Sequence, residues 1–369
     1  METMETVWIA PLILPMRYPP RMCRLAISIA ASCLPLLAQW TVQDSRTRAS
    51  LRGIHNVGDG IAWASGSGGT ILRTTNGGET WQTCALPPDA EKLDFRGIQA
   101  FDGATAVVMS SGPGDHSRIY KTTDSCQSWK LVFTNPDKEG FLDALQFSGA
   151  SLGALIGDPV NGHFPVFLTE DGGNTWHKPN PKGIAAQKNQ SLFAASNSSM
   201  LLDGRNLIFV TGGGTNALIR VDLQLSDAPV SVRPDLAIGA AAGGFSLATR
   251  TEGSNLVMVT VGGDYKLPAQ ATGTAVTCID DRHGSIRCAA SATPPGGYRS
   301  AVAYDDATKT WIAVGPNGTD VSTDDGRDWR PAKPAQGAAP DASQNWNAIS
   351  LPFAVGGNGR IGKLHAGGL

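Results

Sequence analysis

The chain has 369 residues, a hydrophobic fraction of 41% and a charged fraction of only 17%, which supplies enough apolar material for an extensive core and excludes intrinsic disorder. Its 30 Lys and Arg residues nearly balance its 32 Asp and Glu residues, so no overall field points to nucleic acid or to an anionic membrane surface. We therefore expect a globular protein without a nucleic-acid partner.

Residues 1–38 hold apolar runs broken by prolines and are interpreted as a targeting segment. Arg21 and Arg24 precede an apolar run, residues 25–38, that is too short for a comfortable membrane span. We expect a signal peptide cleaved near Ala38 and an exported protein, periplasmic or extracellular. Met16 or Met22 could be the true start, and a retained N-terminal anchor is the alternative.

The segment 169–176, of sequence Thr-Glu-Asp-Gly-Gly-Asn-Thr-Trp, has the composition of a tight turn between two strands. The Asp can accept hydrogen bonds from the following backbone N–H groups, the glycines tolerate positive φ, and the Trp begins the returning strand as an apolar anchor. Looser copies give four pairs of polar residue and Trp: Asn76 with Trp81, Asp124 with Trp129, Asp171 with Trp176, and Asp324 with Trp329.

The spacing of these turns predicts a ring of repeated units. Positions 76, 124 and 171 are 48 and 47 residues apart, and the 153 residues from 171 to 324 make three intervals of 51. A second motif, a large apolar residue followed by a polar or small residue and a short apolar strand, begins at Leu51, Phe95, Leu142, Phe193, Phe245, Tyr298 and Trp346. Periods of about 40 to 50 residues with short strands are typical of β-propeller blades. We predict an all-β single domain, residues 39–369: a seven-bladed β-propeller of four-stranded antiparallel blades.

The last unit is one strand short, and the N-terminus can supply the missing strand. Strands are expected at residues 346–351, 353–355 and 360–364, after which the sequence stops. The segment 40–43 resembles the fourth strands that start at the four Trp residues. We expect it to close the ring, because both sheet edges would then be paired.

Four cysteines remain outside the targeting segment: Cys84, Cys126, Cys278 and Cys288. This even number suits an exported protein. Cys278 and Cys288 flank a hairpin turn and could form a disulfide across a strand pair; two free buried thiols are the alternative. No Cys or His spacing resembles a zinc site, so no metal is expected.

The four turns resemble the Asp-box, or bacterial neuraminidase repeat, of sialidases, xyloglucanase-type glycosidases and the photosystem II stability and assembly factor family. The Arg-Gly-Ile strands at 52–54 and 96–98, and the layout of residues 39–369, most resemble that last family. The resemblance implies structural rather than catalytic boxes and a non-enzymatic ring that binds a protein, such as a membrane-protein assembly client. We expect a monomer without a cofactor.

Two sets of residues are candidates for binding. The position after each strand-initiating residue forms one layer around the channel: Arg52, Arg96, Asp143, Ala194, Ser246, Arg299 and Asn347. Its three arginines could form a cationic collar for a carboxylate, phosphate or acidic peptide, or could bridge neighbouring blades through backbone carbonyls. The second set lies in the turns opposite the boxes, where ordinary turn chemistry is the alternative: Asp115, His116, Asp158, His163, Asp264, Tyr265 and Lys266.

The alternative function is a glycoside hydrolase that acts on extracellular glycans. The Arg-Ile-Pro motif of sialidases is absent, and no Tyr and Glu are placed together convincingly. A xyloglucanase-type enzyme would use two carboxylates across a cleft. Asp158 and Asp264 are the pair that we would assign to catalysis in that case.

Overall fold

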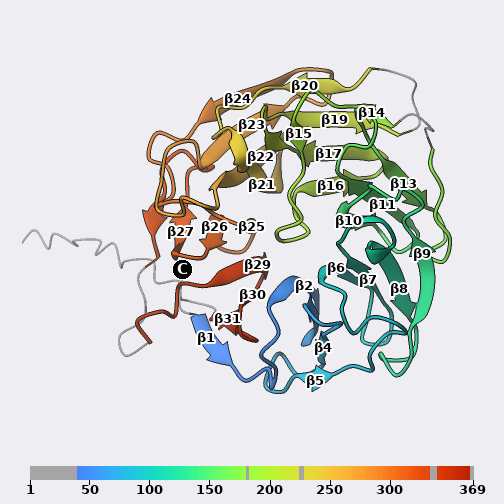
Figure 1. Cartoon of the computed structure of the whole chain (residues 1–369). Helices are drawn as coiled ribbons and strands as arrows, with labels where there is room; N and C mark the ends of the chain where they lie inside the picture. The colour runs from blue at the N-terminus through green and yellow to red at the C-terminus, as the bar shows by residue number, and fades with distance from the viewer. Residues whose placement is uncertain (1–39, 180–182, 224–227, 333–338, 366–369) are drawn as a thin grey trace, which may run out of the picture. The chain divides into compact units, whose positions relative to one another are not determined.

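The structure, a computed structural model, describes residues 40–179, 183–223, 228–332 and 339–365. These residues belong to one compact unit, in which seven of the eight antiparallel sheets surround a centre (Figure 1). The prediction of an all-β, seven-bladed β-propeller is therefore confirmed. The expected targeting segment, with its cleavage near Ala38, lies outside the described residues.

Blades 1, 2 and 6 each contain four strands in chain order, paired antiparallel. Blade 1 consists of β2 (Leu51–Gly58), β3 (Ile61–Gly66), β4 (Ile71–Thr74) and β5 (Gln82–Thr83). Blade 2 consists of β6 (Phe95–Ala100), β7 (Ala106–Ser110), β8 (Arg118–Thr122) and β9 (Lys130–Thr134). Blade 6 consists of β25 (Ala301–Asp305), β26 (Thr310–Gly315), β27 (Gly318–Ser322) and β28 (Arg330–Pro331).

Blades 3, 4 and 5 are less regular. Blade 3 consists of β10 (Leu142–Ser148), β11 (Leu152–Gly157) and β13 (Val166–Thr169), and β12 (His163–Phe164) pairs separately with β14 (Ile184–Ala185). Blade 4 consists of β16 (Met200–Asp203), β17 (Asn206–Val210), β19 (Leu218–Asp222) and β20 (Val230–Val232). Blade 5 consists of β21 (Gly239–Glu252), β22 (Asn255–Asp264), β23 (Ala275–Asp280) and β24 (Ile286–Ala290), extended by β15 (Gln190–Ser191) and β18 (Gly212–Gly213).

Blade 7 joins the two ends of the ring. Its strands β29 (Trp346–Ser350), β30 (Phe353–Gly356) and β31 (Ile361–Leu364) are completed by β1 (Trp40–Gln43), which pairs antiparallel with β31. Trp40 is 4% exposed, and its ring centroid lies 5.4 Å from that of Trp346. The predicted closure by the N-terminal strand is confirmed, because β1 hides both an edge of the sheet and a large apolar side chain.

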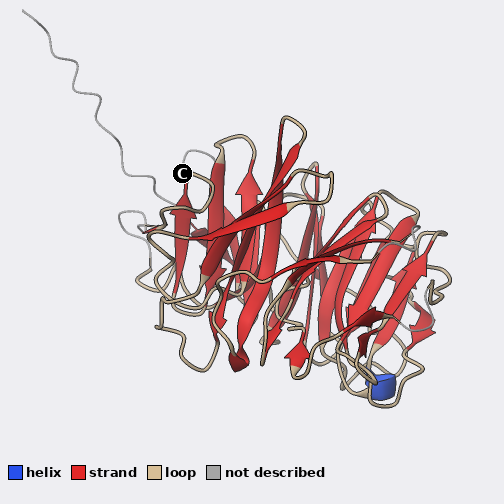
Figure 2. Cartoon of the chain, turned by 90° about the horizontal axis from the view of Figure 1, so that it is seen from above, coloured by secondary structure: helices blue, strands red, loops and turns tan. Residues whose placement is uncertain are grey.

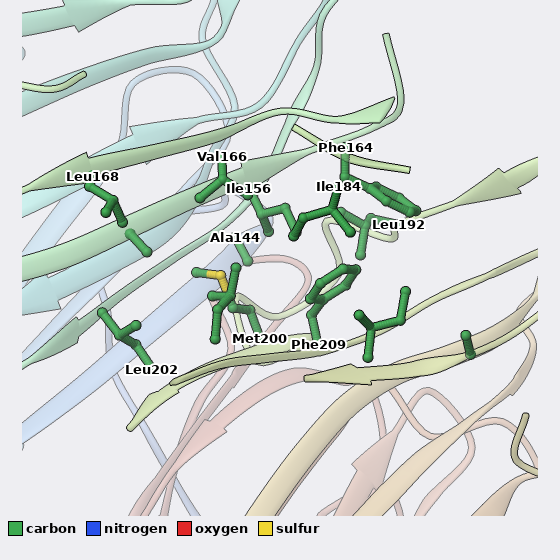
Figure 3. Packing of buried hydrophobic residues seen from close by; sticks show 14 residues of the cluster. Ala144, Ile156, Phe164, Val166, Leu168, Ile184, Leu192, Met200, Leu202 and Phe209 are labelled. Atoms are coloured by element: carbon green, nitrogen blue, oxygen red, sulfur yellow. The ribbon is translucent and has the colours of Figure 1, made fainter. Parts of the chain in front are cut away.

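Apolar side chains fill the spaces between blades. Between blades 3 and 4, Ile156 and Phe164 face Met200 and Phe209, and all four are buried (Figure 3). The Phe164 and Phe209 rings pack edge to face with centroids 5.4 Å apart. Each blade therefore depends on its neighbour to cover its apolar face, which explains why the repeats occur as a closed set.

Glycines at the ends of the second strands are required by crowding rather than by turn geometry. In five blades, a Cβ at this glycine would collide with a backbone carbonyl oxygen near the entry of the inner strand. The pairs are Gly66 with Ser50, Gly157 with Phe141, Gly262 with Gly243, Gly315 with Tyr298, and Gly356 with Asn345. In these five blades the glycine therefore lets the end of the second strand lie close to the start of the first.

The turn segments that marked the repeats have the hydrogen bonds expected from their composition. The Asp171 carboxylate accepts the backbone N–H groups of Asn174 at 2.9 Å and Thr175 at 3.0 Å. The Thr175 hydroxyl also donates to it, at 2.7 Å, and these bonds hold the pKa of Asp171 below its usual range. Asn76 fills the same position with its amide oxygen, which accepts the N–H of Thr80 at 3.0 Å.

Two disulfides tie the outer parts of the blades. Cys278 and Cys288 are directly opposite on β23 and β24 and are joined in blade 5, where the hairpin lacks a Trp anchor. Cys84 and Cys126 are also joined, across 42 residues, and link the end of blade 1 to the turn of blade 2. In that turn Cys126 has a φ of 61°, the conformation that a glycine adopts in the other copies.

Candidate functional site

The turns between second and third strands and the connections between blades lie on one side of the ring, which we call the connection face. The described part of the chain has one helix, the 3-10 turn η1 (Gly114–His116), and it lies in a loop at this face (Figure 2). Antiparallel pairing also places the start of every inner strand here. The polar turn residues singled out from the sequence fall on the same face: Asp115, His116, Asp158, His163, Asp264, Tyr265 and Lys266.

The inner strand of blade 4 differs from the prediction. The sequence motif placed its start at Phe193, but β16 begins at Met200, and residues 193–199 leave the sheet. Ala194 is therefore not part of an inner strand, and the layer of seven equivalent positions is broken at this blade. We call residues 193–199 the crossing segment; Figure 1 shows the chain before β16 reaching toward the centre of the ring.

Small polar side chains hold the crossing segment inside the channel. The Asn197 side chain accepts the backbone N–H of Leu145 at 2.8 Å and donates to the Leu145 carbonyl at 2.9 Å, in blade 3. The Ser196 hydroxyl donates to the carbonyl of Ser300, before blade 6, at 2.9 Å. Because the segment bonds to blade 3 and to the residue before blade 6, it crosses the channel and forms a floor below the channel opening on the connection face.

Arg52 is a cation of this opening without an ion-pair partner among the described residues. It is the second residue of β2, it is partly buried, and its Nε is buried without a hydrogen-bond partner in the described chain. Burial, and next the charge of Arg96, lower its pKa from the ordinary value, although Asp94 acts in the opposite direction. An arginine remains charged at neutral pH, so this position favours an incoming anion.

A cavity on the connection face gives access to Arg52. It has a volume of about 530 Å³ and lies between the chain leaving β1 and the turns of blades 6 and 7. Asn345, Asn347 and Arg360 line it together with Arg52. The carboxylates Asp44 and Asp341 also line it, and Arg360 pairs with Asp341 at 3.0 Å. Arg52 is thus accessible from a polar cavity in which the other arginine already has a counter-ion.

The sequence left two roles open for the arginines, binding an anion and bridging to backbone carbonyls, and Arg96 combines both. Its Nε donates to Asp94 at 2.8 Å, and its Nη1 donates to the carbonyl of Ala194 at 3.1 Å. The second bond connects blade 2 with the crossing segment, so Arg96 helps to hold the floor of the opening. Its side chain is still 26% exposed, so part of its charge remains accessible to solvent.

Arg299 has a structural role. It precedes β25 and is 2% exposed, and its Nε donates to the Asp320 carboxylate at 2.6 Å. Its Nη1 donates to the carbonyl of Tyr298 at 2.8 Å and to the side chain of Asn317 at 2.5 Å. With its donors used inside blade 6, Arg299 is not part of a cationic collar, which is reduced to Arg52 and Arg96.

The two aspartates that would serve a hydrolase occupy separate blades. Asp158, after β11 in blade 3, accepts the backbone N–H of Leu192 at 2.8 Å, and Asp264, at the end of β22 in blade 5, accepts that of Lys266 at 2.8 Å. The carboxylate close to Asp158 is Asp143, whose pKa is raised well above its ordinary value by burial and then by the charge of Asp158. Burial also raises the pKa of Asp158.

Asp94, Asn347 and the crossing segment contribute more to the opening than the sequence indicated. Asn347 donates to the carbonyl of Leu51 at 2.8 Å and so links blade 7 to blade 1 beside Arg52. A sequence signal for the crossing segment was present in Ser196, Asn197, Ser198 and Ser199, four polar residues where a strand would alternate. Among the described residues no group of three or more His, Cys, Asp or Glu side chains could hold a metal ion, and no helix is long and apolar enough to cross a membrane.

Neither a family model nor a curated protein matches the sequence. Solved structures do resemble the fold. YCF48 from Cyanidioschyzon merolae superposes with a TM-score of 0.60 and 18% identity, over 89% of this chain and 99% of that chain. A structure of YCF48 bound to D1 peptide gives a TM-score of 0.60 and 16% identity, over 90% and 99% of the two chains.

A glycosidase shares the fold as well. The GH74 xyloglucanase from Xanthomonas campestris superposes with a TM-score of 0.52 and 15% identity, over 88% of this chain. The match covers 53% of the xyloglucanase, so this chain spans about half of its length. At such identities these likenesses establish a shared β-propeller fold, and function must be argued from the residues of the site.

Proposed function

We propose that the protein is a non-enzymatic, assembly-factor-like β-propeller that captures a carboxylate-bearing segment of a client protein at the channel opening on its connection face. The observation that carries this proposal is Arg52, a partly buried guanidinium with an unpartnered Nε, next to Arg96 and open to a cavity of about 530 Å³. A membrane-protein assembly client is the partner class that we favour.

The electrostatics favour an anionic ligand. Two neighbouring cations in a partly desolvated opening repel each other, and a carboxylate between them would relieve that repulsion and supply acceptors for the free donors. The planar fork of an arginine suits both oxygens of a carboxylate. The floor formed by the crossing segment also matters, because it favours the end of a chain or a single side chain over a strand threaded through the ring.

Two further observations support the proposal. One structural neighbour, YCF48, was solved with D1 peptide bound, so a propeller of this fold takes a peptide ligand. The two disulfides, Cys84–Cys126 and Cys278–Cys288, are typical of proteins that fold in an oxidising compartment. We therefore propose that the ring acts after export, in the periplasm or outside the cell.

The proposal can be tested with a library of ten-residue peptides that carry free C-terminal carboxylates, passed over immobilised ring, residues 39–369. We expect Arg52→Gln to weaken binding of the selected peptides by about 10- to 100-fold, since a hydrogen-bonded charge contributes about 1.5–3 kcal/mol. Arg330→Gln removes the same charge from an exposed position on β28 and serves as the control. Equal retention by the wild type and by Arg52→Gln would contradict the proposal.

A glycoside hydrolase is the second candidate, favoured by the likeness to the xyloglucanase and by two neighbouring carboxyl groups with raised pKa values, the buried Asp143 and the partly buried Asp158. Purified ring would then cleave xyloglucan or a sialoside. Asp158→Asn would abolish that cleavage, because loss of a general acid or nucleophile removes orders of magnitude in rate. Such an activity would replace the binding function proposed above.

A further inference from the structure

Four aromatic side chains lie together at the channel opening. The Phe193 and Phe245 rings are stacked, with centroids 4.1 Å apart and an interplanar angle of 8°. Tyr265 packs edge-on against both, at 6.4 Å and 6.2 Å, and Tyr298 packs edge-on against Phe245 at 4.8 Å. We call these residues the aromatic cluster; they come from the crossing segment, β21, the turn after β22 and the connection before β25.

The aromatic cluster is only partly covered. Phe245 and Tyr298 are 2% and 6% exposed, whereas Tyr265 is 46% exposed and Leu267, two residues later, is 55% exposed. The exposed Tyr265 ring, packed on largely covered aromatic rings, therefore presents apolar surface on the face that also carries Arg52. Exposed apolar groups of this kind, bordered by polar residues, are typical of binding sites.

The aromatic cluster and the arginines are continuous. Arg96 donates to the carbonyl of Ala194, the residue after Phe193, at 3.1 Å. On the other side, burial raises the pKa of the Tyr298 hydroxyl, and this hydroxyl is close enough to Arg52 and Tyr265 for their charges to act on it as well. One opening therefore holds a cation without an ion-pair partner in the described part of the chain, and an apolar surface beside it.

We propose that this opening recognises the C-terminal residue of a client: its α-carboxylate pairs with Arg52 and its apolar side chain packs on the aromatic cluster. This inference rests on the function proposed above and adds the specificity for the last side chain. A terminal residue carries both groups on one Cα, whereas an internal Asp or Glu offers the charge without an adjacent apolar group. The crossing segment below the opening also stops a continuing chain.

The test uses fluorescein-labelled pentapeptides Gly-Ser-Gly-Ser-Phe with a free carboxylate, the same sequence ending in Ala, and the C-terminal amide of the Phe peptide. Fluorescence polarisation gives the dissociation constant of each for residues 39–369. We expect the Phe acid to bind about tenfold or more tightly than the Ala acid, from burial of the ring. The Phe amide should lose affinity by a similar factor.

Tyr265→Ala should remove the preference for Phe over Ala and leave the affinity of the Ala peptide unchanged. Tyr265→Phe should keep the preference, and Leu131→Ala, at an exposed apolar residue of β9, serves as the control. Thermal denaturation of each variant establishes that it folds. Because Tyr265 is 46% exposed, its truncation should leave the melting temperature near that of the wild type.

The outcomes separate the two proposals. If neither acid binds, the carboxylate-binding function falls and this inference falls with it. If both acids bind equally and both require Arg52, the function stands and the aromatic specificity is wrong. A Phe preference that persists in Tyr265→Ala also overturns the inference, since the aromatic cluster would then not contribute to binding. A Phe amide that binds as tightly as the acid overturns it too, since the α-carboxylate would not contribute.

Discussion

Arg299 and Asp320 form an ion pair whose side chains are only 3% and 2% exposed, with the Arg299 Nε donating to the carboxylate at 2.6 Å. Two charges removed from water depend on each other, because neither can recover its hydration while the blade stays folded. The arginine at the same motif position in blade 1, Arg52, lacks such a partner among the described residues. One repeated position therefore supports stability in one blade and recognition in another.

Arg299→Gln should destabilise the ring by about 3–5 kcal/mol, because it leaves the Asp320 carboxylate buried without its counter-charge. Urea denaturation measures the loss. Arg327→Gln is the control: Arg327 lies 4.0 Å from Asp328, both side chains are at least half exposed, and its change should stay within about 0.5 kcal/mol. Equal losses of unfolding free energy in the two variants would show that the buried pair stabilises the ring no more than the exposed pair.

Gly356→Ala should destabilise blade 7 by about 1–3 kcal/mol, because its Cβ would collide with the Asn345 carbonyl oxygen. The neighbouring Gly357→Ala is a matched control. No atom lies within 4 Å of a Cβ built there, and its φ is not positive, so the change should be neutral or slightly stabilising. Thermal melting distinguishes them; a harmless Gly356→Ala would mean that the close approach is readily relaxed.

Trp40→Ala should cost about 3–5 kcal/mol, since it empties a site against Trp346 and weakens the strand that closes the ring. Val42→Ala changes the same strand at a residue that is 46% exposed and should stay within about 0.5 kcal/mol. Deleting residues 40–43 should also promote aggregation through the freed edge of β31, which light scattering detects. An unchanged melting temperature after the deletion would refute closure by β1.

His55 should make stability depend on mildly acidic pH. Burial lowers its pKa from 6.5 to about 4, and its Nδ1 accepts the N–H of Ala100 at 3.4 Å. Between these two values the unfolded chain binds the proton and the folded chain does not, so the free energy of unfolding falls as the pH drops from 6.5 toward 4. We expect a loss on the order of 2 kcal/mol, less than the shift alone implies because the side chain keeps some contact with solvent.

His55→Gln is the test of that dependence. The amide can accept the Ala100 N–H and does not titrate, so the stability profile should become flatter across this window. Urea midpoints measured at several pH values in wild type and variant give the comparison. Parallel profiles would assign the pH dependence to titrating groups other than His55.

The repeats were readable because their causes are local. A carboxylate that satisfies the next few N–H groups, as at Asp171, and a glycine such as Gly356 against its own blade's carbonyl leave a residue pattern within a few positions. Ring closure followed from counting strands. These features fixed the number of blades and the partner of β1 without knowledge of any long-range contact.

The site was less readable because its residues are distinguished by distant partners. The residues around Arg299 do not indicate that it pairs with Asp320, which lies 21 residues later. Likewise, the residues around Arg52 do not indicate that it lacks such a partner among the described residues. Phe193 matched the strand motif, yet the side chain of Asn197 finds its hydrogen bonds in another blade, 52 residues away. A local sequence pattern cannot predict whether this segment joins its own sheet or bonds to another blade, because the outcome depends on which surfaces the ring brings together.

The pairing of Trp40 with Leu364 also sets the order in which the protein can be completed. Among the strands, the ribosome synthesises β1 first and its partner β31 last. β1 therefore cannot pair until all the other strands have been synthesised. The intervening blades can form meanwhile, each against the one before it. Until the final strand arrives, two unpaired edges remain exposed to other chains, and a nascent chain that stalls before Ile361 has no means of hiding them.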